Sequence, residues 1–466
     1  MKRGYITVFF AIAISLCLSL ILALVYGVRE SAIRLKVKES ADVCIRSTFA
    51  QYQRELWENY NLIFVDAGYG SKASGPILSE EHFKNFMNKN FYENPMVVMG
   101  GKDFLSLTCN DVETKEIRFA TDENGKAVLN QAVKWMRYKY GIVDLLKLYE
   151  KSMDALEEYN EDEYREKIEK AKSDIGDNPP FQIEEWISSS DEFLMDRSDV
   201  SLLSSIRLIY KDISFISENA YREEDLIESR NLNKGNIKQD KESDLADKLF
   251  FTEYVLTYCG NFVSEMSNTA LKYESEYLIT GMEADAKNLE SMVNLLLVLR
   301  TASNATELYK DKVTIKEIEG LSQAIATLCL NPELAKPIAV LIETVWIFNE
   351  SKNDVWLLLS GEKVPLGKAP SEWKTTFLNP VSSNHSEEGY EEGFEYKDYL
   401  RMFLYTVDTK TLTNRFMNVC EQNVRKSTNN PNFRLDNCFD AWKATSYVTS
   451  DFGYEYMATR KYDIEE

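Results

Sequence analysis

The sequence predicts a helix-dominated α+β protein. An N-terminal transmembrane helix continues into a long stalk helix and then into a globular body with a small, antiparallel sheet. Three observations predict this fold class. Residues 5–28 contain no charged side chain. Apolar residues recur at helical spacing along most of the remaining chain, and alternating segments of the strand type are short and scattered. Scattered strands among many helices are typical of the α+β class.

The run from Tyr5 to Val28 is long enough to cross a bilayer. Its 24 residues span about 36 Å as a helix, and the hydrocarbon core is about 30 Å thick. A cleaved secretory signal has a shorter apolar region and ends in a small-x-small site, whereas ALVYG is a poor cleavage site. A buried helix of a soluble protein would keep a polar face. We therefore expect a retained anchor, with these two alternatives left open.

Charges at the ends of the anchor predict its orientation. Lys2 and Arg3 favour a cytoplasmic tail at residues 1–4, and residues 29–466 are then extracytoplasmic. Basic residues just beyond the anchor weaken this bias: Arg29, Arg34, Lys36 and Lys38.

Composition excludes some partners. The chain of 466 residues has a formal charge of −21, and all 75 acidic residues follow the anchor. Such a surface repels phosphates, so we expect no nucleic acid partner. Seven cysteines form no C-x-x-C pair and no zinc pattern. Cys420 and Cys438 are the nearest candidate disulfide outside the cytoplasm, but free thiols are favoured.

Helical spacing continues past the anchor without a Pro or Gly through Ile45, Phe49, Tyr52 and Leu56. This predicts a stalk helix over residues 29–59, followed by a short strand, LIFV. The next segment, DAGYGS, resembles the D-x-S-x-S cation loop of von Willebrand A domains. Glycines stand where that loop needs hydroxyl groups, so a turn is favoured over a metal site.

The first part of the body, residues 60–180, mixes helices and strands. SEEHFKNFMNKNF predicts a helix capped by Ser79, and FLSLTCNDVETKEIRFAT predicts two short strands around a polar turn. Residues 125–174 predict long helices, the last of them highly charged. DIGDNPPFQ predicts a turn or linker, and residues 175–195 are the candidate boundary between two parts of the body.

The second part, residues 190–466, is richer in helices and either stands alone or forms one domain with the first. Alternation in LKYESEYLI and FGYEYMATRKY predicts two strands. Helices are predicted for LADKLFFTEYVL, EYKDYLRMFLYTV and TNRFMNVCEQNVRK. Two further helices are predicted by apolar stripes, one through Leu289, Met292, Val293, Leu296 and Leu299, the other through Ile338, Leu341, Val345 and Phe348.

The sequence contains no catalytic motif. His82 and His385 are the only histidines, and neither has a metal-ligand partner at a diagnostic spacing. H-E-x-x-H and G-x-S-x-G are absent, and GEKVPLGK departs from the phosphate loop G-x-x-x-x-G-K-[ST]. We therefore expect no enzyme activity, no cofactor and no metal. A hydrolase whose carboxylate pair is brought together only by the fold stays as an alternative.

The N-terminal segments RGYITVFFAIAISLCLSLILALVYGVRESAIR and ESADVCIRSTFA resemble TadE/TadG-type pilus-assembly proteins. Those proteins have a membrane helix near the N-terminus, an arginine just beyond it, and then small residues followed by Asp, here Ala41-Asp42. Type IV prepilins and TadE-like pseudopilins have Gly before the cleaved bond and Glu five residues later. Gly4 is present, but Phe9 stands in place of the Glu. The resemblance therefore favours an uncleaved, TadG-like anchor.

Over nearly its whole length the chain is similar to an uncharacterised family of Gram-positive, mostly clostridial, membrane proteins often encoded with Tad-type (Flp) pilus genes. The matching segments are FAQYQRELWENYNLIFVD, NQAVKWMRYKYG, ESRNLNKG, LKYESEYLITGMEADAKNLESMVNLLLVLR, DVWLLLSGEKVPL, YKDYLRMFLYTVD and FRLDNCF. The resemblance implies a non-enzymatic, membrane-anchored structural or accessory component of a Tad-type pilus or secretion apparatus. The alternative is a surface receptor or binding ectodomain.

Small residues in the anchor are candidates for contact with another membrane helix. Ala11, Ser15 and Ser19 are four residues apart, and small side chains let helix backbones approach closely in lipid. We expect the partners to be the membrane itself and other single-pass pilus-assembly or pseudopilin-like proteins.

Overall fold

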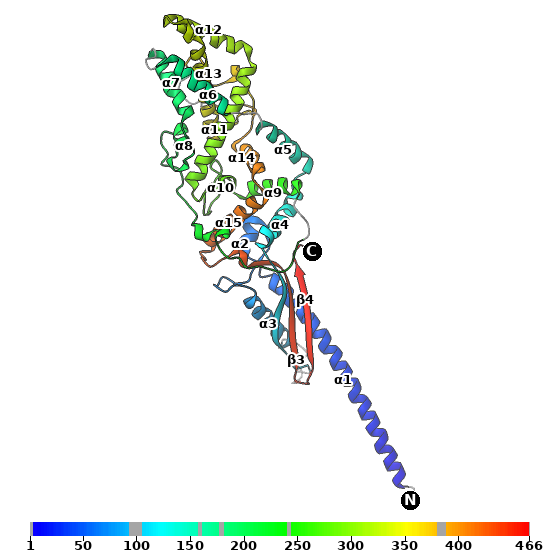
Figure 1. Cartoon of the computed structure of the whole chain (residues 1–466). Helices are drawn as coiled ribbons and strands as arrows, with labels where there is room; N and C mark the ends of the chain where they lie inside the picture. The colour runs from blue at the N-terminus through cyan, green and yellow to red at the C-terminus, as the bar shows by residue number, and fades with distance from the viewer. Residues whose placement is uncertain are drawn as a thin grey trace. The chain divides into compact units, whose positions relative to one another are not determined.

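The structure is a computed structural model and describes residues 3–92, 105–156, 161–176, 181–239, 244–379 and 388–465. Helices dominate it, with one small antiparallel sheet, as the sequence predicts (Figure 1). The chain forms two compact units. Unit 1 combines Met1–Gln131, Asn231–Lys241 and Val424–Glu466, and unit 2 combines Ala132–Arg230 and Glu242–Asn423. The sequence predicts a division of the body in chain order, into residues 60–180 and 190–466. The two units of the structure are each assembled from segments that are distant in sequence.

Unit 1 contains a four-stranded sheet and three helices. The strands are β1 (Val65–Asp66), β2 (Leu107–Phe119), β3 (Cys438–Ser450) and β4 (Glu455–Asp463), and the helices are α1 (Arg3–Phe49), α2 (Arg54–Tyr60) and α3 (Ile77–Tyr92). Of these helices, α1 and α3 pack on the sheet. β3 pairs antiparallel with each of the other strands. It carries the fully buried Trp442, whose ring lies 5.7 Å from that of Phe83 on α3.

The second half of α1 belongs to the core of unit 1. Ile33, Val37 and Ala41 are buried at helical spacing, as are Ile45 and Phe49. They join the sheet face that carries Trp442. Because this stripe comes from the same helix as the apolar run of residues 5–28, no loop separates that run from the folded body.

The stalk helix ends earlier than predicted. α1 ends at Phe49, and a short turn separates it from α2. The backbone N–H of Gln53 donates to the carbonyl of Phe64 at 2.7 Å, which takes it out of any helical ladder. Tyr52, predicted on the apolar stripe, is exposed. A tertiary hydrogen bond therefore ends a helix that local sequence would continue.

Two predictions for residues 77–119 need correction. α3 begins at Ile77, so Ser79 lies inside the helix and does not cap it. FLSLTCNDVETKEIRFAT contains one long strand, β2, in place of two strands and a turn. The register of β2 against β3 shifts between Cys109 and Asp111 and between Thr114 and Glu116. Such bulges interrupt the alternation of buried and exposed side chains, so the strand resembles two shorter ones in sequence.

Gly235 explains part of the segment ESRNLNKG. A Cβ on this residue would lie 2.2 Å from the carbonyl oxygen of Ile117 on β2, so only glycine fits. Next to it, the side chain of Asn236 accepts from the Ile117 N–H and donates to the Lys115 carbonyl, each at 2.9 Å. This segment covers the edge of β2.

Unit 2 is helical. It contains α5 (Ile142–Leu156), α6 (Glu161–Ile175), α7 (Phe181–Leu194), α8 (Ser204–Ile209), α9 (Leu245–Tyr258), α10 (Glu274–Thr280), α11 (Asp285–Lys310), α12 (Lys312–Leu328), α13 (Ala335–Leu359) and α14 (Tyr396–Thr406). α4 (Lys126–Arg137) and α15 (Thr409–Thr428) each belong partly to this unit. The predicted apolar stripes of α11 and α13 are buried, and these two helices pack together.

The prediction of a strand at LKYESEYLI is wrong, because residues 274–280 form the helix α10. The alternation that predicts a strand does not match exposure. Glu274 and Glu276 are as fully buried as Leu278. Both carboxylates bind backbone N–H groups of a neighbouring loop, those of Gly260 and Phe262. These polar residues therefore face inward, and their spacing carries no information about a sheet.

Candidate functional site

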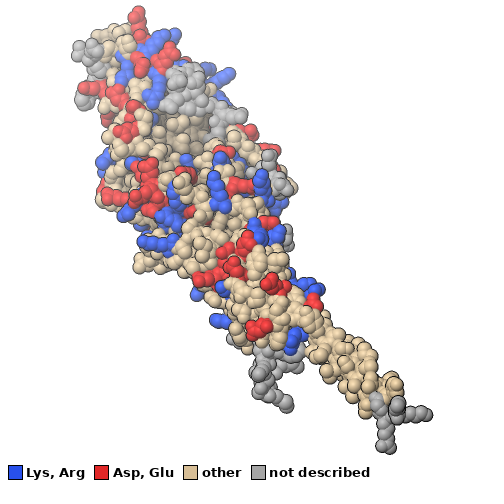
Figure 2. Space-filling view, turned by 60° about the horizontal axis from the view of Figure 1, so that its bottom comes forward, with Lys and Arg blue, Asp and Glu red and all other residues tan. Residues whose placement is uncertain are grey.

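The first half of α1 carries apolar side chains that the described part of unit 1 leaves largely exposed. Most large side chains of residues 5–28 are exposed, among them Leu16 at 65%. In Figure 2 this part of α1 is a surface without charge, unlike the body. Among the helices that the structure describes, α1 is the one long and apolar enough to cross a membrane.

The predicted helix-packing residues lie on this exposed part of α1. Ala11, Ser15 and Ser19 occupy successive turns of one side. The hydroxyl of Ser19 donates to the carbonyl of Leu16 at 2.8 Å, so its polar group is satisfied within the helix. The three residues are exposed, and their role in contacting another helix stays a prediction.

The DAGYGS segment forms a turn held by its own carboxylate. The two oxygens of Asp66 accept from the N–H groups of Gly68 at 2.9 Å and Gly70 at 2.8 Å. Burial raises the pKa of Asp66, although these two donors oppose the rise. Gly70 has a φ of 79°, a conformation that favours glycine. A backbone turn thus accounts for the spacing of Asp and Gly in this segment.

The remaining metal and thiol candidates are dispersed. His82 lies on α3 with its ring 4.0 Å from that of Tyr69, and His385 lies outside the described residues. Within the part of the chain that the structure describes, no three His, Cys, Asp or Glu residues gather as a metal site. All seven cysteines are free, including Cys420 and Cys438.

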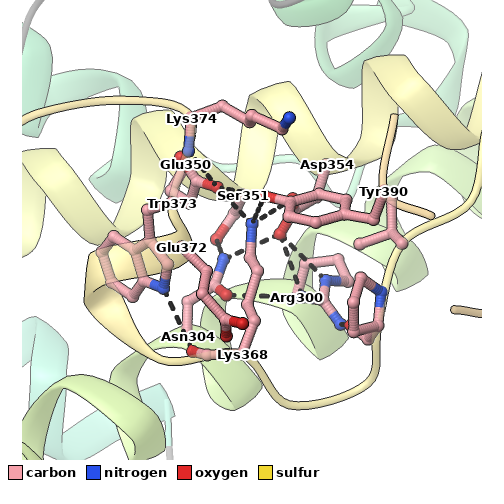
Figure 3. Close-up of polar contacts among 12 residues, drawn as sticks. Arg300, Asn304, Glu350, Ser351, Asp354, Lys368, Glu372, Trp373, Lys374 and Tyr390 are labelled. Carbon is pink, nitrogen blue, oxygen red and sulfur yellow. Dashed lines mark hydrogen bonds and ion pairs between the residues drawn. The ribbon is translucent and has the colours of Figure 1, made fainter. Parts of the chain in front are cut away.

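Unit 2 contains a buried network of four charged side chains, which we call the Arg300 network: Arg300, Glu350, Asp354 and Lys368 (Figure 3). Each of the four side chains is at most 1% exposed. Arg300 Nη2 lies 3.0 Å from Asp354 Oδ2, and Lys368 Nζ lies 2.6 Å from Asp354 Oδ1. Lys368 also pairs with Glu350. Two cations thus face two carboxylates, and the buried charges balance.

The Arg300 network fastens a loop to two helices. Arg300 comes from α11, Glu350 and Asp354 come from α13, and Lys368 comes from the loop after α13. Arg300 Nη1 donates to the loop carbonyls of Pro365 at 2.9 Å and Leu366 at 2.8 Å. Glu350 accepts from the Thr375 N–H at 3.0 Å and from its hydroxyl at 2.7 Å. The segment GEKVPLGK therefore holds a structural lysine and a pair of acceptor carbonyls.

The Arg300 network has the properties of a structural network of ion pairs. Lys368 Nζ lies between two carboxylates and also donates to Tyr390 at 2.8 Å, so it has three acceptors around it. Burial and the nearby carboxylates of Glu350 and Asp354 raise the pKa of Tyr390, which keeps its hydroxyl protonated. Charges buried in this way are tolerated when each has a partner.

A second buried group, the carboxylate triad, consists of Glu274, Glu276 and Asp285. Each member is bonded to backbone N–H groups of residues 259–273. Gly260 donates to Glu274 at 2.8 Å, Phe262 donates to Glu276 at 2.8 Å, and Lys272 donates to Asp285 at 2.9 Å. Burial raises the pKa of both Glu274 and Glu276 to about 7. The triad holds this loop against α10 and α11.

Sequence reasoning missed both buried groups. One signal was available for the Arg300 network, because Glu350 and Asp354 are one turn apart among the apolar residues of α13, and Arg300 ends the apolar run LLLVLR. Charges within an apolar helical stripe indicate buried pairs, since isolated buried charges are costly. Nothing in the sequence indicated that Lys368 would complete the network.

Together these features define a helix-dominated α+β protein with one N-terminal helix suited to crossing a membrane. The chain belongs to the DUF5702 family, a family of unknown function, which matches residues 185–450. That region contains the Arg300 network and the carboxylate triad, and it excludes α1. No curated protein and no solved structure matches the chain.

Proposed function

We propose that this chain is a non-enzymatic, single-pass membrane protein that holds an extracytoplasmic body, and that it serves as a structural or accessory component of a Tad-type pilus or secretion apparatus. The observation that carries the proposal is α1. One uninterrupted helix, Arg3–Phe49, has an exposed apolar first half and a second half with one side buried in the core of unit 1.

This construction suits a protein that positions a body at a membrane. A flexible linker would let the body diffuse around its anchor, whereas a continuous helix transmits the direction of the anchor to the sheet. The paired, balanced charges of the Arg300 network also support a structural role, because a catalytic site needs a group free to exchange protons or electrons with substrate.

Membership in a Tad-type apparatus rests on the resemblance of the N-terminal segment to TadE/TadG-type proteins. Phe9, in place of the Glu of pilins, supports a retained anchor. A retained anchor in such an assembly would contact other single-pass helices, and Ala11, Ser15 and Ser19 offer a face for close approach.

Crosslinking in native membranes tests this proposal. The triple variant Ala11→Leu, Ser15→Leu, Ser19→Leu keeps the span apolar. It should reduce crosslinking to single-pass pilus-assembly proteins without preventing insertion. Ala13→Leu with Cys17→Leu is the matched control, because about 3.6 residues per turn place these two positions on the opposite side of the helix. Recovery of no pilus-assembly component from the wild-type protein would defeat the proposal.

A binding ectodomain is the second candidate, and a pocket in unit 2 favours it. The pocket has a volume of about 670 Å³ and is lined by Tyr390, Phe394 and acidic residues including Glu391. Lys151 also lines the pocket, and its ammonium lies 4.5 Å from the centre of the Phe394 ring, so the lining combines aromatic rings with charges of both signs. Crosslinks from the body to a surface ligand, with none from the anchor, would favour this function.

A further inference from the structure

The tip of the β3–β4 hairpin lies beside the end of the anchor. Both belong to unit 1, and Figure 1 shows the hairpin running along α1 toward its N-terminal half. Arg29 lies over the ring of Phe452 at 3.7 Å, and the rings of Tyr26 and Tyr454 are 5.2 Å apart. Residues 451–454 of the hairpin therefore lie level with residues 26–29 of α1.

That level coincides with a membrane surface if residues 5–28 cross a bilayer. About 20 helical residues span the hydrocarbon, and the head-group layers add several ångströms on each side. Tyr26 and Arg29 then fall where the hydrocarbon ends and the head groups begin. A part of the protein that lies beside Tyr26 and Arg29 is then at the same depth, at the boundary between the hydrocarbon and the head groups.

We propose that the hairpin tip, residues 451–454, is a second membrane contact that sits among the lipid head groups beside α1. This inference rests on the proposed membrane anchor. It adds that the folded body touches the bilayer through a site separate from the anchor.

The chemistry of the tip fits a lipid surface. Phe452 is 44% exposed although it is large and apolar. Tyrosine and other amphipathic rings concentrate at the membrane–water boundary, and an arginine there reaches lipid phosphates. Phe452, Tyr26 and Arg29 are the side chains of this kind at the surface. Tyr454 is buried in the core of unit 1, and its ring contacts that of Tyr26.

A second contact would restrict the body. One helix in a bilayer is free to rotate about its axis and to tilt. Further along the hairpin, Arg460 pairs with Asp42 of α1, which fixes the sheet to the helix. With the tip also held by lipid, one side of unit 1 would always face the membrane.

The test uses the full-length protein in nanodiscs of phosphatidylcholine and phosphatidylglycerol. A trifluoromethyl-phenylalanine label is placed at Phe452 or, as a matched control, at Tyr462. Tyr462 has similar exposure, 38%, and lies seven residues along β4 from Glu455 at the tip end of the strand. At about 3.3 Å per residue this is about 23 Å further from the tip. A third label at Leu18 reports on the anchor. Fluorine relaxation is measured with spin-labelled lipids and with a water-soluble gadolinium chelate.

We expect the lipid spin label at the upper acyl chain to relax the label at 452 more than the label at 462, and the chelate to show the reverse order. Equal relaxation of both positions by the chelate would place the tip in water and overturn the inference. Shielding of 452 from both agents would mean that protein covers the tip, which also overturns it. If Leu18 is relaxed by lipid in either case, the anchor stands and only this inference fails. If Leu18 is not relaxed by lipid, both fail.

Discussion

Charged side chains are almost fully buried in the centre of unit 2, and each of them faces a partner. Arg300 and Lys368 share Asp354, and Glu350 closes the set. Replacing a whole buried network with apolar residues is often neutral, but removing one member leaves an uncompensated charge. The stability of unit 2 should therefore be more sensitive to the loss of one member of the Arg300 network than to the loss of the whole network.

Lys368→Met should show this dependence. It leaves Glu350 and Asp354 with only Arg300 to offset them, and we expect the free energy of unfolding to fall by about 3–5 kcal/mol. Hydrogen exchange of α13 amides in increasing urea measures the effect on unit 2.

The control for this variant is Lys287→Met, which breaks the surface pair with Glu283. Exposed pairs contribute about 0–1 kcal/mol, so the control should change little. Equal losses in the two variants would show that burial of the Arg300 network has no energetic consequence.

Glu276 should make the stability of unit 2 depend on pH. Burial raises its pKa from the ordinary 4.5 to about 7. Between these values the folded protein holds a proton that the unfolded chain has released. The free energy of unfolding should therefore fall as pH rises from about 4.5 to 7 and level off above that range. Glu274, shifted in the same direction, adds to this slope.

Glu276→Gln should reduce the slope. The amide oxygen can still accept from the Phe262 N–H and the Tyr396 hydroxyl, which both bond to Oε1. Thermal unfolding at pH 5 and pH 7.5 measures the difference between variant and wild type. Glu283→Gln is the control, because this exposed residue has a lowered pKa through its bond to Lys287. An unchanged slope in Glu276→Gln would mean that Glu276 is ionised throughout.

At the scale of elements, sequence predicts best where burial alone decides the pattern. Every residue of the predicted stripes of α11 and α13 is buried. Prediction fails where hydrogen bonds override the pattern. Glu274 and Glu276 turn inward on α10, and the N–H of Gln53 leaves the helix for the carbonyl of Phe64. β3 was not predicted, because it is buried on both faces and does not alternate.

The two sides of α1 beyond the anchor should respond differently to substitution. Ile33 is 0% exposed and Leu35, two residues on, is 58% exposed. Ile33→Ala should lower the stability of unit 1 by about 2–5 kcal/mol through lost contacts and a cavity. Leu35→Ala should change it by no more than about 0.5 kcal/mol. Hydrogen exchange of β3 amides in urea measures both, and equal effects would show that α1 is not part of this core.

At the scale of the whole molecule, the long apolar helix could be predicted from sequence and the buried networks could not. An uncharged run of 24 residues is visible without any structure. The Arg300 network joins residues 54 and 14 positions apart in the chain, from α11 to α13 and from α13 to the next loop. Only the packing of α11 on α13 brings these charges together.

Protease digestion of intact, wall-stripped cells tests the central claim most directly. If residues 5–28 cross the membrane and the body lies outside, added protease should degrade residues 29–466 while a cytoplasmic marker protein stays intact. The membrane fraction should keep a fragment that contains the anchor. A body that is protected until the cells are lysed would contradict this account.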